Sequence, residues 1–351
     1  MTRSPEQTDL FGVASPSANA SHSAARGRRA ASGVVEAAPV SDDVRALASS
    51  LPATLHLGTS SWAFPGWHGL VYAHEERTER LTRHGLAAYA QHPLLRSVGL
   101  DRTFYQPIAR EAFAAYADVL PADFRMLVKA HAAVTTPGGL ARFRAPGAPD
   151  VYLDAEYATR AVVEPAVEGL GERLGVLLFQ CPPLPRQPRV VTEFPRRLAR
   201  FLRALPRGVP YAVEVRTAAL LLDDATREAY IDALAEGGAT HGFTVHPSMP
   251  PIPEQLERLP ASVWGQGPVA VRWMLQRDQE YESARDAWAP FHEVAAPDPV
   301  TRVEVAELVR TLLAGARPVI VIANNKAEGS APRTLMALAR ALLGSTGPGT
   351  A

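Results

Sequence analysis

Residues 319–324 read Val-Ile-Val-Ile-Ala-Asn, a run of five apolar side chains that ends in an amide. Residues 175–180, Gly-Val-Leu-Leu-Phe-Gln, have a similar apolar interior and end in a second amide. Apolar runs of this length are typical of strands that are covered on both faces, as in a parallel sheet. The two segments therefore predict a buried parallel sheet whose strands end in polar side chains.

Six further β-rich segments alternate with longer segments of helical period. The eight predicted strands are residues 54–60, 96–101, 124–129, 175–180, 211–216, 239–246, 269–274 and 319–324. The helical stretches between them include residues 108–120, 154–174, 190–205, 226–236 and 301–313, which are long enough for the crossovers that parallel strands require. Eight such units over roughly 290 residues predict an α/β fold, a (β/α)8 TIM-like barrel.

The rival architecture is an open, doubly wound sheet. Such a sheet more often carries a glycine-rich phosphate loop after its first strand. Here the first predicted strand runs into Gly58-Thr59-Ser60-Ser61-Trp62, and no such loop follows. The barrel is therefore the favoured fold.

Composition and charge restrict the class of protein. The chain is 47% hydrophobic and 21% charged, which is ordinary for a soluble globular protein. Lys plus Arg equals Asp plus Glu at 36 each, which argues against a strongly basic nucleic-acid binder and leaves only a local basic patch for direct nucleic-acid contact. Cys181 is the single cysteine, so an intrachain disulfide and a Cys-based zinc site are excluded. With no membrane-spanning apolar run and no signal-peptide pattern, we expect a cytoplasmic protein without membrane contact.

The first 48 residues differ from the rest of the chain. They are rich in Ser, Ala, Gly and Arg, and Phe11 is their only aromatic residue. Such a segment buries too little apolar area to offset the entropy lost on ordering. We therefore predict a disordered tail at 1–48, a single barrel domain at 49–345 and a disordered C-terminus at 346–351.

The tail contains one short motif. Gln7-Thr8-Asp9-Leu10-Phe11 resembles the peptide with which bacterial DNA-replication and repair proteins bind the sliding clamp. A disordered segment with a Leu-Phe anchor pair suits such docking. The alternative is a chance similarity within an unstructured tail.

Several motifs in order resemble the YecE-like family, a domain family of unknown function (domain of unknown function 72). The matching residues are Gly58-Thr59-Ser60-Ser61-Trp62 with Pro65-Gly66-Trp67, Thr103-Phe104-Tyr105 with Pro107, Phe124 to Lys129 with Ala130, Leu177-Leu178-Phe179-Gln180 with Pro182-Pro183, Glu214 with Arg216, and Asn324-Asn325. The resemblance covers roughly residues 55–343 and implies a (β/α)8 barrel, with no settled biochemical role.

The chain departs from the family pattern at two places. Where many relatives carry a Glu and an Asn before the Thr-Phe-Tyr motif, this chain has Gly99 and Asp101. Lys326 stands after the last predicted strand, where an acidic residue is frequent. Chemistry that depends on those carboxylates is in doubt for this chain.

Polar and charged residues gather at the predicted strand ends, where barrels of this type carry their functional loops. Strand side chains alternate between faces, so Glu214 and Arg216 share a face and are expected to point toward the barrel axis. A pocket for a small polar ligand, anionic or hydroxylated, is predicted there. Its predicted ligand-binding residues are Trp62, Asp101, Tyr105, Lys129, Gln180, Arg216, Arg272, Asn324 and Asn325.

Glu214 and His246 are the candidate catalytic residues, each as a general base. The enzymatic hypothesis is hydrolysis or isomerisation of a phosphorylated or polyhydroxylated ligand. The alternatives are binding without catalysis, an internal ion-pair network that fills the barrel, and a DNA-repair accessory recruited through the tail motif. The sequence does not identify a cofactor.

Three other features carry less weight. His131 and His246 could ligate a metal with Asp101 and Glu214, but no tight His spacing supports this, and no metal site is predicted. Cys181 is interpreted as a buried, inert thiol. Trp62 is interpreted either as a stacking platform for a ring or as packing over the barrel mouth.

Overall fold

The strands of the computed structural model follow the predicted segments, with one interruption. The structure describes residues 34–138, 149–264 and 267–344. The strands are β1 Leu55–Thr59, β2 Leu95–Leu100, β3 Arg125–Lys129, β4 Leu174–Cys181, β5 Tyr211–Val215, β6 Ala239–His241, β7 Phe243–Val245, β8 Val269–Trp273 and β9 Val319–Ala323. Their paired neighbours run parallel, in the order β6-β5-β4-β3-β2-β1-β9-β8-β7.

The sixth predicted strand is divided at Gly242 into β6 and β7. These two strands stand at opposite ends of the sheet order and are consecutive in the chain. The Gly242 N–H donates to the Val213 carbonyl at 2.9 Å, which extends the β5–β6 ladder into the break. A Cβ at Gly242 would lie 3.4 Å from the Glu214 Cβ, so this position faces the barrel interior. Segment 239–245 thus brings the sheet close to a closed barrel.

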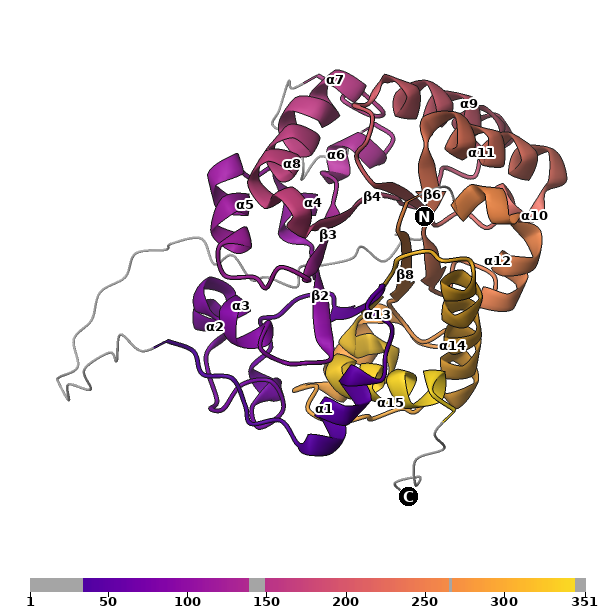
Figure 1. Cartoon of the computed structure of the whole chain (residues 1–351). Coiled ribbons are helices and arrows are strands. Elements are labelled where there is room, and N and C mark those ends of the chain that lie inside the picture. Colours follow the sequence, from indigo (N-terminus) through magenta and orange to yellow (C-terminus); the bar gives the residue numbers. More distant parts are fainter. Residues whose placement is uncertain (1–33, 139–148, 265–266, 345–351) are drawn as a thin grey trace, which may run out of the picture. The chain divides into compact units, whose positions relative to one another are not determined.

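Helices surround the strands on the outside (Figure 1). They are α1 Asp42–Ser49, α2 Thr78–His84, α3 Leu86–Tyr89, α4 Arg102–Tyr105, α5 Arg110–Ala117, α6 Ala132–Thr135, α7 Ala155–Ala158, α8 Glu164–Leu170, α9 Pro188–Ala204, α10 Ala219–Leu222, α11 Asp224–Gly237, α12 Ile252–Arg258, α13 Tyr281–Trp288, α14 Pro299–Ala314 and α15 Ala331–Leu342. The α/β fold with a TIM-like barrel is confirmed.

The alternating faces of the strands divide the core into two parts. On β5, Tyr211 and Val213 belong to the large cluster packed beneath the helices. Ala212, between them, belongs to a separate interior cluster. The interior cluster is aliphatic throughout: Leu127, Val176, Leu178, Ala212, Ala270, Ile320 and Ile322. A dry aliphatic layer therefore fills the middle of the barrel, as expected of this fold.

The loop after β1 is held by packing. A Cβ on Gly58 would lie 2.1 Å from the Ser97 carbonyl oxygen, so only glycine permits the close approach of β1 and β2. The Trp62 indole is 5% exposed, and its Nε1 donates to the Leu81 carbonyl at 3.0 Å. Trp67, in the 3-10 helix Pro65–Trp67, is fully buried. These motif residues are explained by the fold.

The ordered structure begins earlier than the predicted boundary at residue 49. Val35 is 1% exposed, and Ala37 forms a β-bridge with Tyr72. Helix α1 follows, with Ser41 at its N-cap, and its residues contact α15. The prediction of disorder was wrong for this part of the chain. The burial of Val35, the bridge to Tyr72 and the N-cap at Ser41 stabilise a segment whose composition does not indicate order. Residues 1–33, including the motif 7–11, and 345–351 lie outside the described residues.

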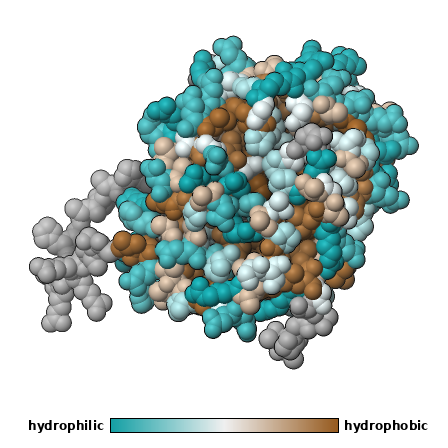
Figure 2. All heavy atoms as spheres, viewed as in Figure 1, coloured by the Kyte–Doolittle hydropathy of each residue, from teal (hydrophilic) through white to brown (hydrophobic). Residues whose placement is uncertain are grey.

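The outer surface mixes residue types. On the face seen in Figure 2, hydrophilic residues are interspersed with separate hydrophobic areas. No helix in the described ranges combines the length and hydrophobicity that a bilayer crossing requires.

Candidate functional site

A polar layer lies directly above the aliphatic interior, toward the carboxyl ends of the strands. Gln180, Glu214 and Arg272 each follow an interior-cluster residue by two positions on the same strand, so they share its inward face. Gln180 and Glu214 are register partners on β4 and β5. All three side chains are 5% exposed or less. The inward direction that alternation predicts for Glu214 agrees with this placement.

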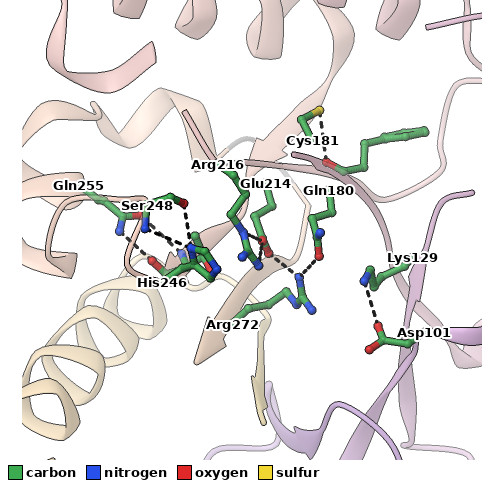
Figure 3. A network of polar contacts seen from close by, with 12 residues as sticks. Asp101, Lys129, Gln180, Cys181, Glu214, Arg216, His246, Ser248, Gln255 and Arg272 are labelled. Carbon is green, nitrogen blue, oxygen red and sulfur yellow. Dashed lines mark hydrogen bonds and ion pairs between the residues drawn. The ribbon is translucent and has the colours of Figure 1, made fainter. Parts of the chain in front are cut away.

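Glu214 is the centre of an ion-pair network, seen in Figure 3. Its Oε1 accepts hydrogen bonds from Nε and Nη2 of Arg216, both at 2.6 Å. Its Oε2 accepts from Arg272 Nη1 at 2.7 Å. The same Arg272 Nη1 donates to Gln180 Oε1, also at 2.7 Å. One carboxylate on β5 therefore joins the guanidinium groups of Arg272 on β8 and of Arg216 just after β5, and Arg272 links this network to the amide of Gln180 on β4.

These contacts determine the protonation state of Glu214. Burial alone would raise the pKa of its carboxyl, but Arg216 and Arg272 outweigh burial and lower the pKa to about 2. Both oxygens are already engaged by cationic donors. A carboxylate in this state is a weak proton acceptor, so its contacts favour a role as an ion-pair centre over the predicted role as general base.

Lys129 forms a second charged contact beside this network (Figure 3). Its Nζ lies 3.3 Å from Asp101 Oδ1, and 4.0 Å from the ring centroid of Phe104. The Thr103 hydroxyl lies 2.6 Å from the Lys129 carbonyl oxygen. Burial lowers the pKa of Lys129 to about 8, although Asp101 acts in the opposite direction. The Thr-Phe-Tyr motif thus holds Lys129 at the end of β3 in two ways. Thr103 binds its backbone carbonyl, and Phe104 lies against its amine.

Lys326 brings a further buried amine to this end of the barrel. It lies in the 3-10 helix Asn325–Ala327 (η6) and is 1% exposed. Its Nζ lies 3.9 Å from the Tyr281 ring centroid and 3.5 Å from Asn324 Oδ1. Burial and the charge of Arg285 lower its pKa to about 8, against the opposing effect of Asp101. The electrostatic influence of Asp101 on both lysines joins them in one charged cluster.

The two predicted asparagines are used differently. Asn324 Nδ2 donates to Ser60 Oγ at 2.9 Å, and its Oδ1 accepts from the Lys326 backbone N–H at 3.0 Å. Asn325 Oδ1 accepts from the Ala331 N–H at the start of α15. Asn325 Nδ2 is buried and has no hydrogen-bond partner among the described residues. Asn325 therefore uses its amide oxygen in a hydrogen bond, whereas its amide nitrogen makes none to the described residues.

His246 is arranged as a hydrogen-bond donor. Its Nδ1 accepts from the Ser248 N–H at 3.1 Å and also lies 2.8 Å from Ser248 Oγ. Burial, reinforced by Arg216, lowers its pKa to about 3, so the ring is neutral at pH 7. Because Nδ1 is an acceptor, the single ring proton lies on Nε2. The ring has no free lone pair for the predicted role as general base.

Other predicted residues lie outside the ion-pair network. Trp62 packs edge-on against Tyr116, 5.6 Å between ring centroids, and is committed to the core. Tyr105 is half-buried on α4, and its backbone is hydrogen-bonded by His131. Burial raises the pKa of the Cys181 thiol to about 12, so the thiol is unreactive at neutral pH.

A metal site finds no geometric support in the described ranges. They contain no group of three or more His, Cys, Asp or Glu side chains arranged to hold an ion. Glu214 and His246 are engaged by Arg216 and Ser248, as described above.

Phe104, Tyr281 and Lys326 were not among the predicted ligand-binding residues, although Phe104 and Lys326 stood out in the sequence motifs. Each contributes to a cation–ring contact, which the sequence does not reveal because the partners come from separate segments. One signal was available for Lys326. Lys129 and Lys326 are the only lysines among the 351 residues, and both lie in this cluster.

The fold and this charged layer define a TIM-like barrel protein with a polar site at the carboxyl ends of its strands. Residues 56–348 match the family described as a protein of unknown function, DUF72. The chain belongs to the DUF72 family, which is the YecE-like family of the sequence motifs. No protein with a curated description matches the chain.

Solved structures of family members share the fold. A DUF72 family protein from Thermotoga maritima aligns with a TM-score of 0.55 and 21% identity, over 82% of this chain and 99% of that one. Two crystal structures of a DUF72 family protein from Enterococcus faecalis align with TM-scores of 0.58 and 0.55 and identities of 17% and 14%. They cover 85% and 83% of this chain, and 99% and 98% of theirs. At these identities the likeness concerns the fold.

The ion-pair network predicts a large loss of stability in Glu214→Gln. The change leaves two buried guanidinium groups without their counter-ion, which costs roughly 3–5 kcal/mol of unfolding free energy at pH 7. The folded pKa is below the ordinary value of 4.5, so the stabilisation is present above pH 4.5 and is lost toward pH 2. Urea unfolding at pH 7 and at pH 3 measures both effects.

The control is Glu193→Gln, which breaks an exposed pair with Arg189 on α9. We expect it to leave the unfolding midpoint unchanged, because exposed pairs contribute little. A Glu214→Gln protein as stable as the unmodified chain at pH 7 would contradict the network.

Lys326→Met is expected to stabilise the chain at neutral pH. No carboxylate of the described residues pairs with Lys326 within 4.0 Å, and Arg285 repels it. Its folded pKa of about 8 lies below the ordinary 10.5, so the cost of burying the cation is complete below pH 8 and fades toward pH 10.5. We expect a gain of about 1–3 kcal/mol at pH 7, since one pKa unit corresponds to about 1.4 kcal/mol and lost packing offsets part of it. Thermal unfolding at pH 7 and pH 10 tests this, and a lower melting temperature at pH 7 would contradict it.

Proposed function

We propose that the chain binds a small polar anion, phosphorylated or polyhydroxylated, at the carboxyl ends of its barrel strands. The observation that carries this proposal is an imbalance of buried charge. Four cationic side chains and two carboxylates act on one another there: Lys129, Arg216, Arg272 and Lys326, with Asp101 and Glu214. Two positive charges in this cluster are left without a counter-ion.

Buried charge without a partner is costly, and a structural ion-pair network would be expected to balance it. An anionic ligand supplies the missing negative charge. Guanidinium groups match the oxygen geometry of phosphate and carboxylate, and the lysine ammonium groups add point charges. The imbalance therefore favours ligand binding over a purely structural network.

Neutral donors in the same region suit a hydroxylated or phosphorylated ligand. Arg272 Nε and Asn325 Nδ2 are buried without a hydrogen-bond partner among the described residues. His246 Nε2 carries a proton that its ring contact with Ser248 does not use. Such donors orient a ligand without adding charge. A cytoplasmic location is part of this proposal, because phosphorylated metabolites are found there.

The proposed enzymatic activity, hydrolysis or isomerisation, cannot use Glu214 or His246 as the base without rearranging their contacts. Lys129 and Asp101 are the remaining ionisable pair in direct contact. We therefore assign proton transfer to this pair, and ligand orientation to the guanidinium groups and Gln180.

A second candidate function is recruitment to a bacterial sliding clamp, carried by Gln7-Thr8-Asp9-Leu10-Phe11. A labelled peptide of residues 1–20 is expected to bind a bacterial clamp saturably in fluorescence anisotropy. The Leu10→Ala and Phe11→Ala double change is expected to weaken this binding at least tenfold, because the apolar anchors carry such contacts. Equal binding of both peptides would refute the recruitment.

The anion proposal is tested with inorganic phosphate by titration calorimetry, with sodium chloride at matched ionic strength as the reference. We expect saturable binding, weakened at least tenfold in Arg216→Met and in Lys326→Met. The second variant is the sharper one, because it is expected to bind less while folding more stably.

Arg196→Met is the matched control. Arg196 is an exposed residue of α9, and its loss changes the net charge equally. It is expected to bind phosphate like the unmodified chain. No saturable heat beyond the salt reference, or unchanged affinity in both site variants, would overturn the anion site.

A further inference from the structure

The two lysines of this chain are placed with unusual selectivity. Lys and Arg together number 36, and only Lys129 and Lys326 are lysines. Both are at least nine-tenths buried, so every exposed basic side chain in the described ranges, apart from histidine, is an arginine. Lysine is therefore retained only in the charged cluster at the barrel end.

Arginine and lysine differ in one respect that is relevant here. Both carry a positive charge and bind anions, but a guanidinium group stays protonated in proteins. A lysine amine in a desolvated, cationic environment loses its proton near neutral pH and becomes a nucleophile. In this chain the exposed positive charges are carried by arginine. Its two lysine amines lie where burial makes loss of a proton accessible.

Lys129 has the surroundings of a nucleophilic amine. The Phe104 ring covers its Nζ on one side, and Arg272 contributes a repelling positive charge. Asp101 Oδ1, at 3.3 Å, is a proton acceptor in direct reach. The Asp101 side chain is 17% exposed, so solvent reaches its carboxylate. The amine and its proton carrier are thus both present.

Lys326 lacks this second component. Its nearest polar contact is the amide oxygen Asn324 Oδ1, at 3.5 Å, and its other neighbour is the Tyr281 ring. An amide oxygen does not carry protons between amine and substrate. Lys326 therefore supplies charge to the cluster, and Lys129 is the better nucleophile.

We propose that Lys129 forms a Schiff base with an aldehyde or ketone that carries a phosphate or carboxylate group. This rests on the anion site of the proposed function, which holds the charged group of the substrate. Arg272, whose charge acts on Lys129, is suited to that task, and Arg216 lies on the far side of Glu214 in the same network (Figure 3).

The covalent step balances without an external reagent. The unprotonated Nζ donates its electron pair to the carbonyl carbon, and the carbonyl π electrons move to oxygen. Asp101 takes a proton from the nitrogen and returns it to the oxygen, which gives a neutral carbinolamine. A proton from water is delivered to the hydroxyl, the nitrogen electron pair forms the C=N bond as water leaves, and the resulting iminium releases its N–H proton to Asp101. The proton gained is thus given back, and amine plus carbonyl yields imine plus water. The imine is an electron sink for loss of a proton from the neighbouring carbon, as isomerisation of a carbonyl compound requires.

The test uses the full chain and pyridoxal 5′-phosphate, an aldehyde with a phosphate group, followed by reduction with borohydride and peptide mass spectrometry. The chain offers only Lys129, Lys326 and the terminal amine as sites, so mapping is unambiguous. We expect stable labelling of Lys129, at least tenfold greater than with pyridoxal, which lacks the phosphate. Inorganic phosphate is expected to protect Lys129, and Lys129→Arg to abolish its label while phosphate still binds.

The outcomes separate this inference from the proposed function. Phosphate binding without a Lys129 adduct would refute the Schiff base and leave the anion site intact. Labelling of Lys326 in place of Lys129, or equal labelling by pyridoxal, would also overturn it. Loss of both phosphate binding and labelling would remove the anion site and, with it, this inference.

Discussion

The shared carboxylate of Glu214 is the contact on which the carboxyl end of the barrel depends. It lies between two guanidinium groups, from Arg216 just after β5 and from Arg272 on β8. Arg272 also binds Gln180 on β4, so the network ties three strands together across the interior. A single side chain with no exposed area thus fixes the direction of both guanidinium groups. Without it, the two cations would repel each other in a site from which water is excluded.

The aliphatic layer beneath makes this network rigid. Leu178 and Ala212 fill the barrel below Gln180 and Glu214, and Gly242 leaves space beside the Glu214 Cβ. The small residues Ala212 and Gly242 leave room for the Glu214 side chain inside the sheet. The barrel therefore separates two tasks along its axis. The aliphatic middle stabilises the barrel by packing, and the carboxyl end holds charged groups at fixed positions.

The sequence predicted the strands well because their apolar content is strong and their spacing regular. It also predicted the inward face of Glu214, since alternation along residues 211–216 leaves only one face for the helices. It failed where the determinant was one specific hydrogen bond, either local or between separate segments. The acceptor role of His246 Nδ1 depends on the Ser248 backbone, and the burial of Trp62 depends on Leu81. Neither contact has a periodic signature.

The early start of the ordered chain is a related case. Helix α1, which contains the buried Val44, contacts α15 near the other end of the chain, so local composition had no means of indicating order. For Glu214, in contrast, the position could be predicted from the sequence but the basicity could not. Its low basicity follows from the two guanidinium donors that face it, and these come from β8 and from the end of its own strand.

The hydrogen bonds of Glu214 to Arg216 and Arg272 restrict which groups in this cluster can react. A carboxylate with both oxygens bound to guanidinium groups holds its neighbours still and is a weak proton acceptor. The reactive groups must then be those whose contacts are incomplete, and in this cluster they are the two amines and the donors on Asn325 and Arg272. Burial, together with the charge of Arg272 at Lys129 and of Arg285 at Lys326, lowers the pKa of both lysines, and the excess of positive charge destabilises the fold. The same imbalance that weakens the fold therefore prepares this end of the barrel for an anionic partner.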